Sequence, residues 1–243
     1  MKVIQQKFNK DIANEWNNIA LLRQKQIESK MDTSFHQILL PNISKQMDLI
    51  ENLPQKKLID LGCGSGYLTN YLSLSVKKTI GIDLSSKNIE LAQKKYTKEN
   101  LHFYKSSIEE FNKDTYDIAV ANMVLMDVVN LDKCIKSISN LIVENGNFIF
   151  SITHPYFWPK YWKYEDEVWY NYSREIIIET EFKIANEITP YETTHIHRPL
   201  GSYIKLLKQY SFEIDSILEL PNDEKSKYPR FLIINCKKIK NKS

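Results

Sequence analysis

A short segment in the first third of the chain concentrates half of its glycine. The 243-residue sequence has only 6 glycines, and Gly62, Gly64 and Gly66 follow directly on the apolar run 57–61. Glycine lacks a Cβ, so it allows tight turns and a close approach of the backbone to a ligand. We therefore expect a strand to turn sharply into a helix here, with the free N–H groups of the helix facing a bound molecule.

The segments around this turn alternate between short apolar runs and helical patterns of apolar residues. Such alternation is typical of right-handed βαβ units around a parallel sheet. It predicts an α/β protein with a Rossmann-like, doubly wound, seven-stranded and mostly parallel sheet that carries helices on both faces. The last two strands are expected to form an antiparallel pair. Strands are expected at 57–61, 78–83, 101–105, 116–121, 147–153, 213–220 and 230–236, and helices at 67–76, 85–96, 131–143 and 200–210.

Two segments depart from this alternation and divide the chain. Residues 1–50 read as two helices, the second kinked or split at Pro41. Residues 155–199 contain no clear βα unit, and 176–184 indicates only a strand or a hairpin arm. The sheet domain is therefore expected to comprise 51–154 and 200–243, with 155–199 as an insertion.

The spacing of the glycines excludes two common phosphate-binding motifs. A dinucleotide fingerprint needs G-x-G-x-x-G and a P-loop needs Gly-Lys-Ser/Thr at its end, whereas this turn reads G-x-G-x-G. Asp83 stands 21 residues after Gly62, at the end of the next expected strand, where a carboxylate can accept both hydroxyls of a ribose. Asp60, before the glycines, suits a positively charged amino group. The expected ligand is a nucleoside that carries no pyrophosphate.

These residues match the pattern of a known family. Asp60-x-Gly62-x-Gly64-x-Gly66 with Asp83 resembles the class I S-adenosylmethionine-dependent methyltransferases, and 105–109, 116–125 and 141–148 extend the resemblance. It implies S-adenosylmethionine as cofactor, S-adenosylhomocysteine as product, and an adenine-contacting loop around Ser107, where most members carry an aspartate. It also implies a helical lid at 1–50, with simple packing on the sheet as the alternative. The cofactor-binding residues expected on this basis are Asp60, Gly62, Cys63, Gly64, Gly66, Asp83, Leu84, Ser107, Ile108, Asn122, Met123 and Trp16.

The insertion begins with an aromatic segment. Nine of the 17 residues in 156–172 are aromatic, whereas the whole chain is 12% aromatic. Either these rings form a small core of their own, or they line an acceptor pocket. The resemblance favours the pocket, because the segment after the fifth strand commonly forms it in this family. The second interpretation makes 155–199 the substrate-binding segment. The expected substrate-binding residues are Tyr156, Trp158, Trp162, Trp169 and Tyr172, with Arg174 and Arg198 as clamps for an anionic acceptor.

Histidines near expected strand ends are candidates for the chemistry. Methyl transfer is an in-line displacement that depends on alignment of the acceptor atom, and a hydroxyl acceptor also gains from a base. We expect His154, which closes the fifth strand, to be this base or an orienting group, with Asp127 and His197 as alternatives. Oxygen is the first choice of acceptor atom and nitrogen the second. His195 and His197 offer two ligands with no evident third, so no metal site is expected.

Charge and composition limit the partners. The net charge is +3 with 33 basic and 30 acidic residues, and 156–200 carries eight acids against five bases, which disfavours a phosphate backbone. No apolar stretch approaches the roughly 18 residues of a membrane span. The expectation is a cytoplasmic monomer or homodimer that methylates a small molecule and binds no membrane. The alternatives are an RNA or protein methyltransferase and a non-catalytic, cofactor-binding regulatory or scaffold protein.

Overall fold

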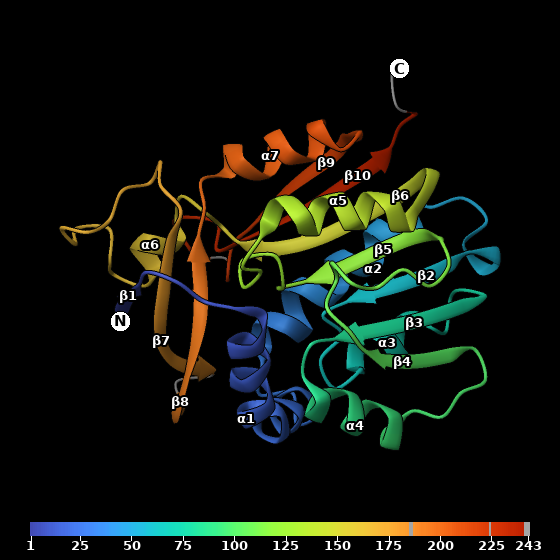
Figure 1. Ribbon diagram of the computed structural model, residues 1–243, viewed down its shortest axis with the longest axis horizontal. Helices are drawn as coiled ribbons and strands as arrows, with labels where there is room; N and C mark the ends of the chain where they lie inside the picture. The colour runs from blue at the N-terminus through green and yellow to red at the C-terminus, as the bar shows by residue number, and fades with distance from the viewer. Residues whose placement is uncertain (185–186, 224, 241–243) are drawn as a thin grey trace.

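The computed structural model describes residues 1–184, 187–223 and 225–240. A seven-stranded sheet in the order β4-β3-β2-β5-β6-β10-β9 runs through the larger part of the molecule (Figure 1). The first five of these strands are parallel, and β10 runs antiparallel to both β6 and β9. The predicted fold class and the antiparallel closing pair are thereby confirmed. The strands are β2 (Lys57–Leu61), β3 (Lys78–Asp83), β4 (Leu101–Lys105), β5 (Tyr116–Asn122), β6 (Ile142–Thr153), β9 (Phe212–Leu220) and β10 (Phe231–Lys238).

Helices cover both faces of this sheet (Figure 1). One core combines the sheet with α5 (Leu131–Leu141) and α7 (Leu200–Gln209). The core on the other face uses residues of η1 (Ser34–Leu39), α2 (Leu40–Asp48) and α3 (Tyr67–Leu72). At the β4 edge, α4 (Ser86–Lys95) packs through Ile89 and Ala92 on Leu101 and Phe103. A short turn, η2 (Leu53–Gln55), leads into β2.

Two predicted boundaries shift. Helix α3 ends at Leu72 rather than residue 76, and β6 begins at Ile142 rather than residue 147. The β5–β6 register is irregular between Tyr116 and Ile118, so the first residues of β6 form a separate pairing before Gly146. In the second N-terminal helix the break falls at Leu40, where the π-helix η1 passes into α2. Pro41 stands in the first turn of α2, so the residue that cannot donate a backbone hydrogen bond coincides with the change from π-helix to α-helix.

A second, smaller sheet was not predicted. It has the order β1-β7-β8 and is antiparallel throughout. The insertion supplies β7 (Ile176–Ile184) and β8 (Glu187–His197), and the chain start supplies β1 (Lys2–Ile4). The segment 1–50 is therefore not purely helical, because its first residues pair with the insertion before α1 (Asn9–Glu28) begins. In the described ranges, no helix is long and apolar enough to cross a membrane.

Candidate active site

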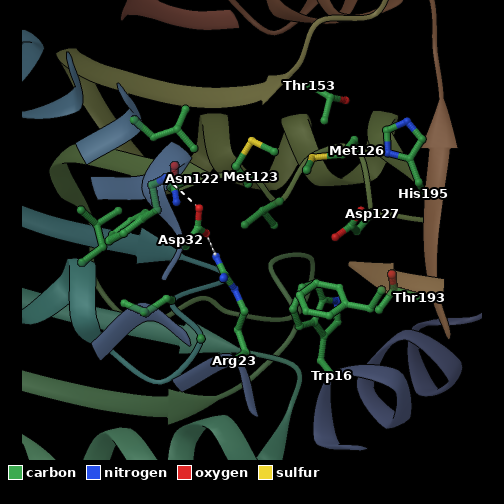
Figure 2. A pocket seen from close by; sticks show the side chains of 18 of the residues that line it. Trp16, Arg23, Asp32, Asn122, Met123, Met126, Asp127, Thr153, Thr193 and His195 are labelled. Carbon is green, nitrogen blue, oxygen red and sulfur yellow. Dashed lines mark hydrogen bonds and ion pairs between the residues drawn. The ribbon is translucent and has the colours of Figure 1, made fainter. Parts of the chain in front are cut away.

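A cavity of about 840 Å³ opens at the edge of the sheet where the parallel strands end. This volume lies within the roughly 300–1,000 Å³ of small-molecule pockets. The glycine turn after β2 and the residues after β3 and β5 form one side. Residues of α6 (Trp158–Tyr161), of β8 and of the start of β10 form the other, and α1 lines a further part of the wall. Figure 2 shows side chains from both sides converging on the same space.

The glycines of the turn do different things. Gly62, Gly64 and Gly66 all have positive φ, at +70°, +54° and +83°, a region that glycine adopts readily. A Cβ on Gly62 would lie 2.5 Å from Val124 Cγ2, whereas a Cβ on Gly64 would meet nothing within 4 Å. Gly64 therefore leaves its space to the cavity that it lines. Gly66 does not line the cavity: a Cβ there would lie 2.8 Å from the Phe103 ring, so its predicted cofactor contact is replaced by packing.

Asp83 anchors the turn from the end of β3. Its Oδ2 accepts a hydrogen bond from Gly64 N at 2.8 Å and its Oδ1 accepts one from Ser85 N at 2.8 Å. Burial raises the pKa of Asp83, and these two N–H donors act in the opposite direction. Each carboxylate oxygen has a further lone pair, and Asp83 lines the cavity. Its geometry thus suits a ligand with hydroxyl donors.

Asp60 lies at the base of the turn and also lines the cavity. Its Oδ2 accepts a hydrogen bond from Thr69 Oγ1 at 2.6 Å. Burial raises the pKa of Asp60 to about 7, and the Asp83 charge adds to the rise. A cationic group in the cavity would therefore be stabilised by an ionised Asp60. Burial also raises the pKa of the neighbouring Cys63 thiol, so this thiol is an inert part of the wall.

Most other predicted cofactor residues line the cavity, namely Leu84, Ile108, Asn122, Met123 and Trp16. Met123 has φ +57°, and its N–H donates to Ser151 O and Oγ, both at 3.0 Å. Ser107 is an exception. It lies outside the cavity because its Oγ accepts a hydrogen bond from Glu110 N at 3.2 Å, whereas Ser106 and Glu109 line the wall.

Asp127 and His195 both line the cavity and lie on neighbouring segments (Figure 2). Among the described residues the Asp127 carboxylate has no hydrogen-bond or ion-pair partner. Burial raises its pKa well above the usual value, Glu15 adds to this, and Arg198 acts against it. Burial lowers the pKa of His195 to about 3, so its ring is neutral at neutral pH. Ile196 N donates to Met126 O at 2.7 Å, which fixes the two segments against each other.

His195 was not predicted as a catalytic residue, and the two histidines that were, His154 and His197, do not line the cavity. His154 is buried, with Nε2 3.0 Å from Glu219 Oε1 and Nδ1 accepting from Tyr156 N and Phe157 N. These contacts hold the start of the insertion and correct its predicted role as the base. His197 donates from Nε2 to Tyr172 O at 3.1 Å, and the rings of Tyr164, Tyr170 and Tyr172 surround it.

The aromatic segment divides between the two predicted roles. Trp158 and Trp162 line the cavity and pack near the His195 ring. The remaining three predicted substrate aromatics do not line it. Trp169 stacks on Tyr164 with centroids 5.4 Å apart, the Tyr172 hydroxyl accepts from Leu200 N at 3.1 Å, and Tyr156 is 61% exposed. These rings hold the insertion together or face solvent.

Both arginines predicted as clamps are elsewhere. Arg174 is exposed. Arg198 is 2% exposed and donates to the carbonyls of Leu125, Val128 and Val129 at 2.7–3.3 Å while it pairs with Glu175. It therefore holds the loop that carries Asp127.

Arg23 and Arg230 line the cavity instead. Arg23 Nη2 pairs with Asp32 Oδ2 at 2.5 Å (Figure 2), and its Nη1 is buried with no acceptor among the described residues. The chain has only four arginines, and this small number was the one feature of the sequence that could have pointed to Arg23 and Arg230. Within the part of the chain that the structure describes, no three His, Cys, Asp or Glu side chains are grouped to hold a metal ion.

Comparisons with known proteins agree with this geometry. Residues 52–186, more than half of the chain, match the family described as a methyltransferase domain. A ubiquinone biosynthesis O-methyltransferase of Pelagibacter ubique is 38% identical over 94 residues, which cover 37% of this chain and 39% of the relative. The chain matches less than half the length of the first curated relatives.

Solved structures share the whole fold. A protein of Listeria monocytogenes assigned to the S-adenosylmethionine-dependent methyltransferases is 25% identical, with a TM-score of 0.67 over 81% of this chain and 97% of that one. The magnesium protoporphyrin IX methyltransferase of Synechocystis, crystallised with S-adenosylhomocysteine, reaches a TM-score of 0.69 over 95% of this chain and all of its own length. At 16% identity, the second likeness concerns the fold alone.

Proposed function

Because this chain belongs to the methyltransferase domain family, whose members take their methyl group from S-adenosylmethionine, we propose that it transfers that group to a small molecule. The acceptor atom is an oxygen, with nitrogen as the second choice. One observation carries the proposal: a single cavity joins the glycine turn to the carboxylate of Asp127, which has no partner among the described residues. The turn supplies a cofactor site, and Asp127 supplies a base beside it.

The residues of the glycine side fit S-adenosylmethionine. Asp83 has lone pairs left for ribose hydroxyls, and Gly64 leaves the space that a Cβ would fill. Asp60 suits the amino group, and the free Nη1 of Arg23 suits the carboxylate of the same ligand. Asp32, which pairs with Arg23, also accepts from Phe35 N, and the Phe35 ring packs on Tyr67 directly after the turn. This places Arg23 on the turn side of the cavity.

The cofactor, when bound, supplies a methyl group that its sulfonium already activates, so the protein's own task is alignment and proton removal. Asp127 would take the proton of an acceptor hydroxyl, because its raised pKa makes it a stronger base than an exposed carboxylate. The neutral His195 ring would hydrogen-bond and orient the same group. Trp158 and Trp162 would enclose the acceptor.

Helix α1 closes the cavity on the remaining side. Glu15 accepts from Thr194 N and Oγ1, both at 2.8 Å. Lys7 pairs with Glu15 and with Glu179 of β7, both at 2.6 Å. These ties join the N-terminal helix to the insertion, and Trp16 of α1 lines the cavity. The arrangement supports a lid that excludes water during transfer.

The test is transfer of an isotopically labelled methyl group from S-adenosylmethionine to a panel of hydroxylated and aminated small molecules, detected by mass. In Asp127→Asn we expect turnover to fall about 10²–10⁴-fold, with affinity for S-adenosylhomocysteine unchanged. Asp166→Asn, an exposed carboxylate of the insertion, is the matched control. Asp127→Asn at full turnover would remove Asp127 from the chemistry. Transfer only to RNA or protein, or cofactor binding without any transfer, would support the two alternative functions.

A further inference from the structure

Arg230 lies directly before β10 and lines the cavity on the insertion side. Its Nη1 donates to Asn222 Oδ1 at 2.8 Å, and its Cζ lies 4.1 Å from the centre of the Tyr161 ring. The Nε–H is buried and has no acceptor among the described residues. The guanidinium forms no ion pair with any residue that the structure describes. The Nε–H of a charged, planar donor is thus left without an acceptor in the described part of the chain.

Trp158 provides a second free donor beside it. The side chain is 6% exposed and lines the cavity, and its Nε1 has no acceptor in the described part of the chain. The Arg230 Cζ lies 5.5 Å from the Trp158 ring. Buried N–H groups without an acceptor are rare in folded proteins. Two of them on adjacent side chains of one cavity indicate that a ligand supplies the acceptor oxygens.

The Arg230 guanidinium favours an anion at this place, although the cavity as a whole is lined by more acidic than basic side chains. Burial lowers the pKa of Arg230, while Tyr161 and Asp32 act in the opposite direction. The Arg230 charge therefore lies where water stabilises it poorly, and an anion there would interact with it strongly.

The order of the strands separates Arg230 from the residues of the glycine turn. In the order β2-β5-β6-β10, Arg230 lies three strands from the glycine turn, or about 14 Å at the usual strand spacing of about 4.8 Å. Arg230 O accepts from His154 N at 2.8 Å, which fixes it beside the end of β6. Asp127 follows β5, two strands away. A single ring with a hydrogen bond at each end bridges such a gap.

We propose that the acceptor carries a carboxylate, which Arg230 Nε and Trp158 Nε1 bind at the far end of the cavity while its hydroxyl reaches Asp127. Such an acceptor is a compact, flat hydroxy acid, because Trp158 and Trp162 form the walls between the two ends. The planar fork of a guanidinium matches a carboxylate in shape as well as in charge. This inference rests on the proposed function, since it assigns the acceptor half of the same cavity.

Calorimetric titration in the presence of S-adenosylhomocysteine tests the proposed carboxylate site. The probes are ortho-, meta- and para-hydroxybenzoate, and the controls are the corresponding neutral hydroxybenzamides. We expect at least one hydroxybenzoate to bind about tenfold more tightly than its amide. Arg230→Gln should bring the two within about twofold, and Trp158→Phe, which keeps an aromatic ring but removes the donor, should reduce the preference severalfold. Arg174→Gln, at an exposed arginine of the insertion, should keep the full preference.

Each outcome decides the matter. Equal binding of acids and amides, a preference that survives Arg230→Gln, or no binding of any hydroxybenzoate at millimolar concentration would overturn the carboxylate site. Unchanged affinity of the variants for S-adenosylhomocysteine shows that they are folded. If the unaltered protein failed to bind S-adenosylhomocysteine, the proposed function itself would fail, which is a distinguishable result.

Discussion

The glycine-turn side of the cavity depends mostly on backbone, whereas the insertion side depends on side chains. On the first side the geometry follows from positive φ angles at Gly62 and Gly64 and from the end of β3. On the second side, two tryptophans, His195 and Arg230 project from three separate elements that pack on one another. A backbone site needs a particular local sequence, whereas a side-chain site needs a particular tertiary arrangement.

This difference predicts that the two sides respond differently to substitution. The turn is fixed by a few contacts within a short segment, such as the two N–H groups that Asp83 accepts. The insertion is fixed by long-range hydrogen bonds, such as the one from Arg198 to the loop after β5 and the one from β8 to Glu15 of α1. We therefore expect substitutions at the long-range ties to lower stability, and substitutions at the turn to act on both stability and cofactor binding.

The largest effect is expected at Arg198. Arg198→Met removes the donors of three carbonyls, and each acceptor left without a donor costs about 1–3 kcal/mol. The free energy of unfolding should therefore fall by about 3–5 kcal/mol, with little contribution from the half-exposed Glu175. Arg174→Met, at an exposed arginine, should change it by less than about 0.5 kcal/mol. Urea denaturation of the unaltered protein and of both variants measures these free energies of unfolding. Equal changes would show that Arg198 does not hold the loop.

On the backbone side, Gly62→Ala should lower the free energy of unfolding by about 3 kcal/mol. The new Cβ would lie 2.5 Å from Val124 at a φ of +70°, which combines overpacking with backbone strain. Gly201→Ala is the matched control, since a Cβ there meets nothing within 4 Å. It should change stability by less than about 1 kcal/mol. A Gly62→Ala protein as stable as Gly201→Ala would contradict the close packing of the turn.

A smaller effect is expected at His154, where the structure corrects the sequence-based role. His154→Ala removes the acceptor of two backbone N–H groups and the contact with Glu219. Stability should fall by about 1–3 kcal/mol, while turnover at a temperature well below unfolding stays within about twofold. Thermal unfolding and the methyl-transfer assay measure the two quantities. A turnover loss as large as that of Asp127→Asn would restore His154 as the base.

The smallest effect is a pH dependence of cofactor binding. The pKa of Asp60 is raised to about 7, so Asp60 becomes protonated in the ligand-free protein as the pH falls through 7. An ammonium group in the cavity favours the ionised form. Affinity for S-adenosylhomocysteine should therefore be flat above about pH 8 and fall below pH 7, approaching tenfold per pH unit. Asp60→Asn should bind more weakly with no such slope, and a slope that persists in this variant would exclude Asp60 as its cause.

The two sides of the cavity also differ in how much of each could be predicted from the sequence. The alternating pattern predicted the seven-stranded sheet, and the spacing of Gly62, Gly64 and Asp83 placed them at one strand edge, because both signals are local. The pattern did not show that β1 pairs with β7, since three residues carry no periodicity and their partner lies far along the chain. Gly66 follows the motif in sequence and Ser107 stands where most members carry an aspartate, yet Phe103 packs on the first and Glu110 N donates to the second outside the cavity.

The acceptor side was predicted only in composition. The aromatic segment marked the insertion, but which rings line the cavity depends on how α6 and β8 pack. His195 and His197 are two residues apart on β8 and so share a face of the strand, yet tyrosines enclose His197 while His195 reaches the cavity. Arg23 and Arg230 come from the two ends of the chain, and only the folded arrangement brings them to one cavity.

Titration of S-adenosylhomocysteine into the unaltered protein and Asp83→Ala tests the central claim most directly, namely that the glycine-turn side binds the methyl donor. We predict one-to-one binding that weakens by at least about tenfold in Asp83→Ala, because the ligand loses the carboxylate that accepts its ribose hydroxyls. Asp166→Ala, at an exposed carboxylate of the insertion, should bind as the unaltered protein does. No binding to the unaltered protein, or equal affinity in a folded Asp83→Ala variant, would contradict the account.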